Sequence, residues 1–245
     1  MISRATFATA ARVLRQLLRD HRTLALLIVV PSLLLVILNF AFDAQPATFD
    51  RIAPAMVGLI PFITMFIVTS IAMLRERTSG TLERLMSMSL NKIDLMAGYA
   101  IAFAAAAAVE VMVASTVVFG LLGTDVDHPL AAVVGVAILS SVLGMVMGLF
   151  VSAFATTEFQ AVQFMPAFVL PQLLICGLFV ERSRMAGWLE GISWAMPLTY
   201  VYDALEQLTT PNALDGMFWL DLVVIVGASL LSLGLGAITL RRRTP

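Results

Sequence analysis

Glu110 is the residue whose type and position most directly suggest chemistry in this chain. It lies in an apolar stretch, residues 95–121, that contains no other Asp, Glu, Lys or Arg. A carboxylate at the centre of a bilayer costs about 2.5–3.5 kcal/mol on insertion scales, so it should be paired, protonated or facing water. Two interpretations stay open: a site in a cavity or proton path, and a structural bond to a neighbouring helix. Counted from Leu95, Glu110 lies past the midplane, which favours the structural bond.

Two amides accompany two prolines in another apolar stretch, residues 161–180. Pro166 and Pro171 cannot donate a backbone hydrogen bond and should kink a helix there. Gln163 and Gln172 can then satisfy the carbonyls that the prolines leave unpaired. These two amides are therefore predicted as intramembrane polar residues alongside the carboxylate.

The chain lacks the residue sets that the common enzyme classes need. A P-loop requires Gly-Lys before Ser or Thr, but the only lysine, Lys92, follows Asn91. His21 and His128 are isolated in the sequence, so no metal site is predicted. An intramembrane enzyme needs a nucleophile and a base at membrane depth, and Glu110 alone cannot provide both. We therefore predict no catalytic residue and no cofactor in this chain.

The elements that position these residues follow from the composition. Hydrophobic residues make up 60% of the 245 residues and charged residues 13%, and the mean hydropathy is +0.96. Soluble domains are about 45–50% apolar and about 25% charged, so the bilayer must solvate much of this chain. Crossing it takes about 20 apolar residues per helix, because lipid offers no partners to a non-helical backbone. Six stretches qualify: 24–43, 54–74, 95–121, 130–155, 161–180 and 221–240.

The predicted fold is therefore an all-α membrane protein with six transmembrane helices, forming a single domain over residues 1–245. Gly144-x-x-x-Gly148, in the fourth stretch, permits close packing against another helix. Residues 181–220 follow the fifth stretch and are largely apolar, with Met196-Pro197 interrupting a helical pattern. We expect short re-entrant helices there that dip back into the outer leaflet, or else an interfacial aromatic anchor.

Positive charges predict the orientation. Twelve of the fifteen Lys and Arg residues fall before the first stretch, between the second and third, or after the sixth, which six spans place on one side. They are Arg4, Arg12, Arg15, Arg19 and Arg22; Arg75, Arg77, Arg84 and Lys92; and Arg241, Arg242 and Arg243. The positive-inside rule makes both termini cytoplasmic. This basic face suits anionic lipid or an acidic partner, and we predict no nucleic-acid binding because no basic groove is interleaved with aromatic residues.

Two cytoplasmic segments have amphipathic patterns. In residues 1–22, arginines at helical spacing occupy one face and apolar residues the other, which predicts an interfacial helix with its apolar side in the acyl boundary. That helix either only anchors the first span or also frames a docking site. Residues 75–94 form a charged island whose helix would begin at Ser79 or Gly80. Its apolar side chains share one face, and its charges remain for solvent or for a partner. The apolar set is Leu82, Leu85, Met86 and Leu90.

The residues of the island resemble a known family. LRERTSGTLERLMSMSLNKIDLMAGY, residues 74–99, is similar to the cytoplasmic loop of ABC-2 type transporter permeases, the membrane subunits of drug, lipid and polysaccharide exporters, including those of the daunorubicin-resistance kind. Residues 164–179 and 191–208 resemble the fifth span of that family and the segment after it. The chain departs from the family where Ser89, Val180 and Ala186 stand in place of frequent prolines.

The resemblance implies a division of labour. Such permeases work as dimers, with an identical copy or a paralogue, and couple to a separate ATP-binding subunit that holds ATP and Mg²⁺. Residues 75–94 would be the coupling loop, and residues 181–220 a re-entrant outer gate. The implied coupling residues are Arg75, Glu76, Arg77, Gly80, Thr81, Leu82, Glu83, Arg84, Leu85 and Met86. The implied gate residues are Trp194, Pro197, Tyr200, Asp203 and Glu206.

The expected function is export of a lipophilic or amphiphilic drug or lipid from the bacterial inner membrane. Export of a lipid-linked polysaccharide is the alternative within the family. A proton-coupled carrier that uses Glu110 as its ion site is the alternative outside it, and such a carrier would transport without any ATPase. The identity of the second permease subunit and the direction of transport stay open.

Overall fold

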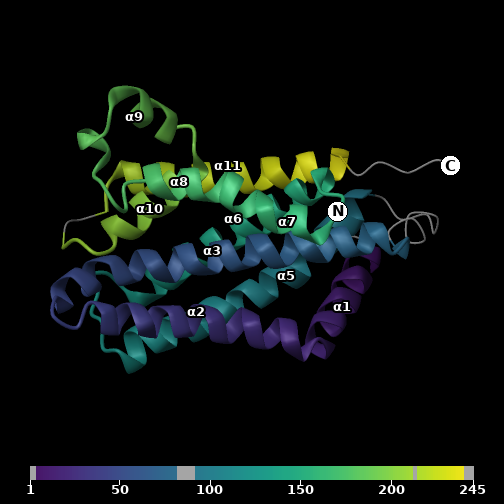
Figure 1. Ribbon diagram of the computed structural model, residues 1–245, viewed down its shortest axis with the longest axis horizontal. Helices are drawn as coiled ribbons and strands as arrows, with labels where there is room; N and C mark the ends of the chain where they lie inside the picture. Colours follow the sequence, from purple (N-terminus) through teal and green to yellow (C-terminus); the bar gives the residue numbers. More distant parts are fainter. Residues whose placement is uncertain (1–3, 82–91, 212–213, 240–245) are drawn as a thin grey trace.

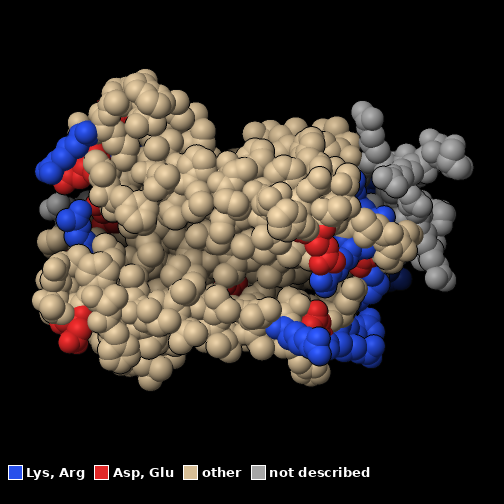
Figure 2. Space-filling model, viewed as in Figure 1, with Lys and Arg blue, Asp and Glu red and all other residues tan. Residues whose placement is uncertain are grey.

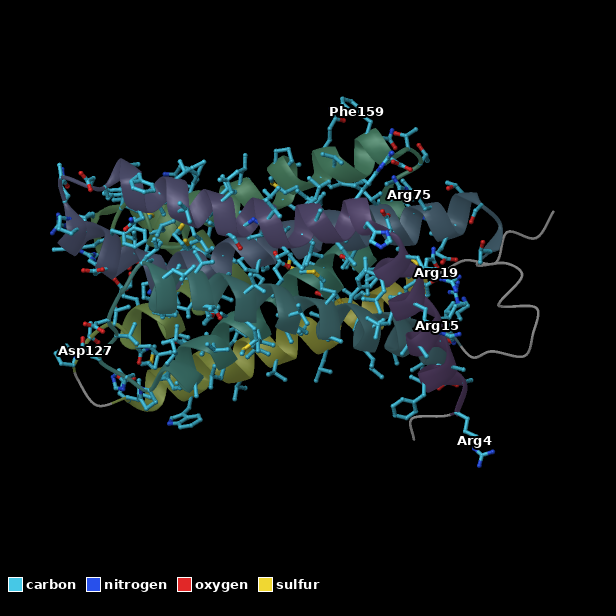
Figure 3. All side chains as sticks on the ribbon, turned by 90° about the horizontal axis from the view of Figure 1, so that it is seen from below. Arg4, Arg15, Arg19, Arg75, Asp127 and Phe159 are labelled. Atoms are coloured by element: carbon cyan, nitrogen blue, oxygen red, sulfur yellow. The ribbon has the colours of Figure 1, made fainter. Side chains whose placement is uncertain are left out.

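The computed structural model describes residues 4–81, 92–211 and 214–239, and these residues contain helices and no strand. The long helices run side by side as a bundle, and α1 lies across one end of it (Figures 1 and 3). In the described N-terminal part, up to residue 151, the long helices are α1 (Arg4–Arg19), α2 (His21–Ala41), α3 (Pro46–Thr78), α5 (Lys92–Ser115, continued by the π-helix η1, Thr116–Leu121) and α6 (Leu130–Val151). The others are α7 (Glu158–Phe164), α8 (Leu170–Ile175), α9 (Gly187–Ser193), α10 (Pro197–Gln207) and α11 (Gly216–Thr239). The all-α prediction is confirmed for the described residues.

Within the described part of the chain, five helical segments are long and apolar enough to cross a membrane. They are His21–Ala41, Pro46–Thr78, Lys92–Leu121, Leu130–Phe154 and Gly216–Thr239. They correspond to five of the six predicted stretches, so the count of six spans is not confirmed. The helix of the second stretch is longer than predicted at both ends.

The stretch predicted as the fifth span, 161–180, is a distorted helix. α7 passes into a π-helical segment, η3 (Met165–Val169), and then into α8, so that 18 residues are helical without a break. Pro166 lies in the π-helical turn and Pro171 in the first turn of α8, where each removes a backbone donor. At 1.5 Å per residue the run measures about 27 Å. α7 lies near the end of the bundle where α1 lies, and α8 lies near α10 (Figure 1).

The bundle is held together most closely where α6 crosses α3. A Cβ atom added at Gly144 or Gly148 would collide with the backbone carbonyls of Phe62 or Phe66, so the two glycines let the helices touch. A hydrogen bond also joins the two helices at this contact: the Thr69 hydroxyl of α3 donates to the backbone carbonyl of Met145 on α6 at 2.9 Å. The close packing predicted from Gly144-x-x-x-Gly148 is confirmed.

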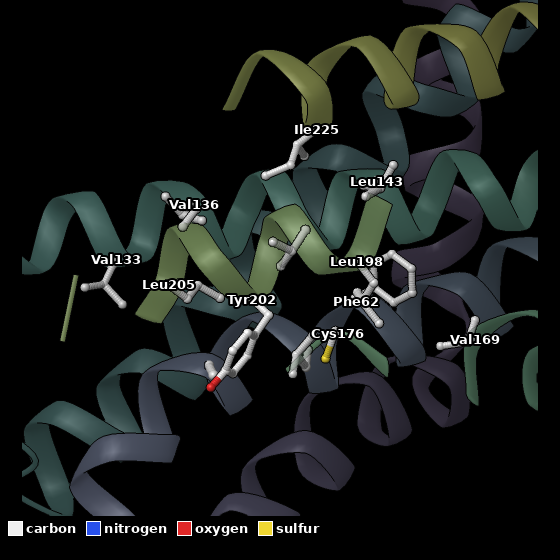
Figure 4. Packing of buried hydrophobic residues seen from close by; sticks show 14 of the residues in the cluster. Phe62, Val133, Val136, Leu143, Val169, Cys176, Leu198, Tyr202, Leu205 and Ile225 are labelled. Atoms are coloured by element: carbon white, nitrogen blue, oxygen red, sulfur yellow. The ribbon is translucent and has the colours of Figure 1, made fainter. Parts of the chain in front are cut away.

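α10 is a short helix that is buried in the bundle. Leu198, Val201 and Leu205 on α10 are fully buried, and they pack with side chains of α3, α6 and α11 (Figure 4). Tyr202 and Cys176 lie beside them in the same cluster. The segment that precedes α11 is therefore part of the core.

Charged side chains gather at the two ends of the bundle, with a broad band between them that shows few charges (Figure 2). Arg4, Arg15, Arg19 and Arg75 lie at one end, which we call the basic end, and Asp127 lies at the opposite end (Figure 3). α1 and the last turn of α11 are both at the basic end (Figure 1).

Candidate functional site

α1 is fixed to the basic end of the bundle by its packing on α5. Ala10, Val13 and Leu17 of α1 are buried in a core cluster with α5. Gly98 makes the approach possible, because a Cβ atom there would lie 2.6 Å from the Thr9 side chain. The apolar side predicted to lie in the acyl boundary is therefore divided: one flank contacts α5, and Phe7 stays 59% exposed.

A polar network joins α1 to α3 and α5 at this end. Arg12 donates to Glu76 Oε1 at 3.1 Å and to the Tyr99 hydroxyl at 2.7 Å. Its guanidinium carbon also lies 5.7 Å from the centre of the Tyr99 ring. Glu76 was expected to face water or a partner, but it is only 6% exposed because α1 lies over it. Arg12, Glu76 and Tyr99 are called the α1 network below.

The two arginines beside Glu76 bind two other elements. Arg75 donates from Nε and a terminal nitrogen to the two carboxylate oxygens of Glu158 at 2.7 and 3.0 Å, which ties α3 to α7. Arg77 donates to the backbone carbonyl of Ser152, in the short turn after α6. The three consecutive side chains 75–77 therefore attach the end of α3 to three neighbours.

The first residues of the charged island belong to α3. This helix continues to Thr78, with Ser79 at its C-terminal cap, and Thr81, directly after Gly80, is helical again. Gly80 therefore lies where the helix of the island was predicted to begin. Gly80 has a φ of +73°, which glycine adopts without strain, and the Thr81 hydroxyl lies 2.9 Å from that of Ser79. The other predicted coupling residues lie outside the described residues: Leu82, Glu83, Arg84, Leu85 and Met86.

The residues predicted for an outer gate meet at the opposite end of the bundle. Pro197 occupies the first turn of α10, and Tyr200 donates to the carbonyl of Trp194 at 2.6 Å. Glu206 accepts from the Tyr202 hydroxyl at 3.0 Å. The structure therefore brings the predicted group together on and beside α10.

Arg182 completes this cluster, and sequence reasoning did not find it. One of its terminal nitrogens donates to both carboxylate oxygens of Asp203, at 2.8 and 2.7 Å, and its guanidinium carbon lies 4.5 Å from the centre of the Trp194 ring. Burial raises the pKa of Asp203, and the ion pair with Arg182 opposes that rise. The available signal was weak, because a basic and an acidic residue 21 positions apart, with α9 between them, cannot be paired by spacing.

Replacing Arg182 with alanine is expected to lower the stability of the chain by about 2 kcal/mol, because it leaves the largely buried Asp203 carboxylate without its cation. Thermal unfolding of the purified chain in detergent measures this. The loss should shrink as the pH falls, since protonated Asp203 no longer needs the cation. Arg184→Ala is the control: its side chain is 74% exposed, so it should unfold like the wild type. Equal losses in both variants would contradict the role given to the Arg182–Asp203 pair.

Glu110 is buried, with 1% of its surface exposed, and it accepts a hydrogen bond from the Thr64 hydroxyl of α3. This contact matches the structural alternative, a bond to a neighbouring helix. The other oxygen, Oε2, has no hydrogen-bond partner among the described residues. The Gln172 amide donates to the carbonyl of Phe168 at 2.9 Å, as expected for a proline-distorted helix, whereas Gln163 is exposed.

The described residues contain five apolar helices, and charges gather at both ends of their bundle, so the chain is a multi-pass helical membrane protein. Comparison with known sequences then gives its family. The sequence model of the ABC-2 type transporter family matches residues 4–209, and the chain belongs to that family.

Relatives of known name agree with this assignment. The chain is 25% identical over 172 residues to the probable multidrug ABC transporter permease YbhR of Escherichia coli K12, a match that covers 69% of this chain and 46% of that protein. It is 21% identical over 202 residues to the probable multidrug ABC transporter permease YbhS of the same organism, covering 81% and 54%. It is 23% identical over 159 residues to ABC transporter G family member 20 of Dictyostelium discoideum, covering 65% and 22%. The matches thus span about half the length of each of the two permeases.

Proposed function

We propose that this chain is the permease subunit of an ATP-driven exporter of a lipophilic or amphiphilic compound, a drug or a lipid. The observation that carries the proposal is the family match over residues 4–209, joined to an apolar helical bundle. The similarity to permeases whose names contain the words "probable multidrug" supports an amphiphilic cargo. ATP and Mg²⁺ would be held by a separate ATP-binding subunit.

The basic end is proposed as the cytoplasmic face of a bacterial inner membrane, so that α1 and the last turn of α11 lie on that side. Two features support this orientation: the arginines at that end, and the positive-inside rule. The opposite end, with α10, would then face outward and carry the outer gate.

Coupling to the ATPase is proposed to run through the loop after α3. The hydrogen bonds and ion pairs of Arg75, Glu76 and Arg77 connect the end of α3, from which that loop starts, to α1, α7 and the end of α6. A displacement of the loop by a closing ATPase would therefore move several helices together. The nucleotide needs only to favour one arrangement of the helices by a few kcal/mol to shift their populations.

A second permease subunit, identical or a paralogue, is proposed to cover part of the exposed apolar surface. α2 and α11 are the most exposed of the long helices in the described part of the chain, because only 17% of the residues in the apolar window of each are buried. The rest of the surface would face lipid. Exposed apolar side chains of these helices include Leu26, Leu33, Phe40, Trp219, Val223 and Leu230.

Reconstitution tests the proposal. The chain and an ATP-binding subunit from the same host are placed together in lipid vesicles, and uptake of a fluorescent cationic dye is followed. Uptake that requires hydrolysable ATP supports an exporter. A lack of any ATP-dependent movement, with dyes and with labelled lipids alike, would contradict it. A lipid-linked polysaccharide as the cargo would appear as movement of that substrate and not of the dye.

The rival carrier is favoured by one observation: Glu110 is buried, and its Oε2 has no hydrogen-bond partner in the part of the chain that the structure describes. Glu110→Gln preserves the size of the side chain and can keep a bond to Thr64. If transport is ATP-driven and Glu110 is structural, the variant should transport within about twofold of the wild type. Transport that needs no ATPase, follows a pH gradient and is lost in Glu110→Gln would establish the carrier instead. Thr64→Val serves as a control that removes the hydrogen bond and keeps the carboxyl group.

A further inference from the structure

A cavity of about 380 Å³ lies between α1, α2, α3 and α5 at the basic end of the bundle. Such a volume is within the range of small-molecule binding sites, roughly 300–1,000 Å³. It extends along α3 from Glu76 to Thr64, which are 12 residues apart, about 18 Å of helix. The cavity is thus elongated and runs from the charged end into the band that shows few charges.

The lining changes in character along this length. Asp20, Gln16 and Glu76 lie at the polar end, together with Arg75. The remainder is mostly apolar and includes Leu27, Val30, Ile67, Val68, Ala72 and Phe103. A molecule that fits has a polar head at the boundary with water and an apolar tail inside the membrane.

Two carboxylates select the charge of that head. Glu76 is buried, and while Oε1 accepts from Arg12, Oε2 has no donor among the residues that the structure describes. Buried carboxylate oxygens are normally hydrogen-bonded, so a ligand that donates a hydrogen bond to Oε2 would be favoured here. Hydrogen bonds from the Thr23 hydroxyl and amide lower the pKa of Asp20, which keeps that carboxylate charged. Arg75, the cationic residue in the cavity lining, is already bound to Glu158.

The cavity is accessible from the bilayer. α2 forms its outer wall, and Leu26 of α2 lines the cavity while remaining 62% exposed. Arg15 and Arg19 lie at the same end of the molecule (Figure 3) and can attract a lipid phosphate. An amine-bearing phospholipid combines these properties: an ammonium group that donates hydrogen bonds, a phosphate and an apolar chain.

We propose that this cavity binds a bilayer phospholipid with an ethanolamine head. The ammonium group donates to Glu76 Oε2 and lies beside Asp20, and an acyl chain occupies the apolar part between α2 and α3. This binding is a property of the chain alone and needs neither ATP nor a partner, so it can be tested whether or not the proposed export is correct.

Native mass spectrometry of the full purified chain in detergent tests the proposal with three added lipids of the same acyl chains. The probes are phosphatidylethanolamine, phosphatidylcholine, whose quaternary ammonium cannot donate, and phosphatidylglycerol, which has no amine. The expected result is at least fivefold more bound phosphatidylethanolamine than either of the others. Equal binding of all three would overturn the proposal.

Two variants localise the binding. Ala72→Phe fills the apolar part of the cavity, and Asp20→Asn removes a charge from the rim while keeping a side chain that caps α2 equally well. Each should lower retention of phosphatidylethanolamine several-fold. The matched controls are Ala105→Phe, at an exposed position on the same bundle, and Asp43→Asn, at the far end of α2, and both should bind like the wild type.

The variants are compared only after thermal unfolding shows that each is folded. If Ala72→Phe does not fold, the result for Asp20→Asn alone tests the proposal. Retention in Asp20→Asn equal to that in Asp43→Asn would contradict the head-group contact. A competition experiment distinguishes a lipid site from a site for a single-chain amine. Dodecylamine is bound first, and added phosphatidylethanolamine should displace the dodecylamine. Saturable dodecylamine binding that this lipid does not displace would refute a phospholipid as the occupant.

Discussion

Replacing Gly144 or Gly148 with alanine is expected to destabilise the chain by about 3 kcal/mol, because the new methyl group has no space. A Cβ atom at either position would meet backbone atoms of α3, and backbone cannot move aside as the end of a flexible side chain can. The helices would have to separate, which would also break the hydrogen bond from Thr69 to the carbonyl of Met145. The midpoint of thermal unfolding in detergent measures the loss.

Gly135→Ala is the control for this prediction, since it makes the same substitution on the same helix. A Cβ atom at Gly135 would meet no atom of the described residues within 4 Å. Alanine is the better helix former, by about 1 kcal/mol, so this variant should be as stable as the wild type or more so. If Gly144→Ala and Gly135→Ala unfold at the same temperature, the contact between α3 and α6 is not as close as described.

Replacing Arg12 with alanine is expected to lower the stability of the chain by about 2 kcal/mol, because it leaves the buried Glu76 carboxylate unpaired. The loss should be smaller than for a fully buried pair, since 32% of the Arg12 side chain is exposed. The Tyr99 hydroxyl would lose its donor at the same time. Because the α1 network joins α1 to α3 and α5, the variant should also weaken any stimulation of ATP hydrolysis by substrate in the reconstituted complex.

A double-mutant cycle separates the pair from general damage to α1. Glu76→Gln in the Arg12→Ala background removes the unpaired charge, so the double variant should recover part of the lost stability. Arg15→Ala is the control on the same helix, because Arg15 is exposed and bonds only to the carbonyl of Ala11 within the described residues. Additive losses from Arg12→Ala and Glu76→Gln would show that the two side chains do not interact.

The parts of the fold that depend on local pattern were predictable from the sequence. Five of the apolar stretches correctly predicted helices in the described residues, because lipid requires helices of about 20 residues, although α3 extends beyond its stretch at both ends. The glycine pair on α6 correctly indicated a close contact. The stretch 161–180 was predicted as a span but not as a π-distorted helix, because the register that a chain adopts around Pro166 and Pro171 depends on its neighbours.

The candidate site was predictable only as a set of residues on each segment. Residues 75–77 were expected to serve a partner, but their bonds within the chain join them to Arg12, Glu158 and Ser152. These partners lie more than 60 positions away, and no spacing rule connects them. Gate residues on one short helix, such as Tyr200 and Glu206, could be grouped by proximity in sequence. Arg182, the partner of Asp203, could not, since it lies in a separate short 3-10 helix (Arg182–Arg184), 21 positions earlier.

The measurement that tests the proposed function most directly is co-purification of the chain from its host membrane. Wild type is compared with Glu83→Ala and Leu85→Asp, two substitutions in the loop after α3, and with Asp43→Asn at the other end of the bundle as the control. We predict that an ATP-binding subunit is recovered with the wild type and with Asp43→Asn and is lost from both loop variants. If no ATP-binding subunit accompanies the chain under any condition, or if both loop variants retain it as the wild type does, the proposed coupling through this loop is contradicted.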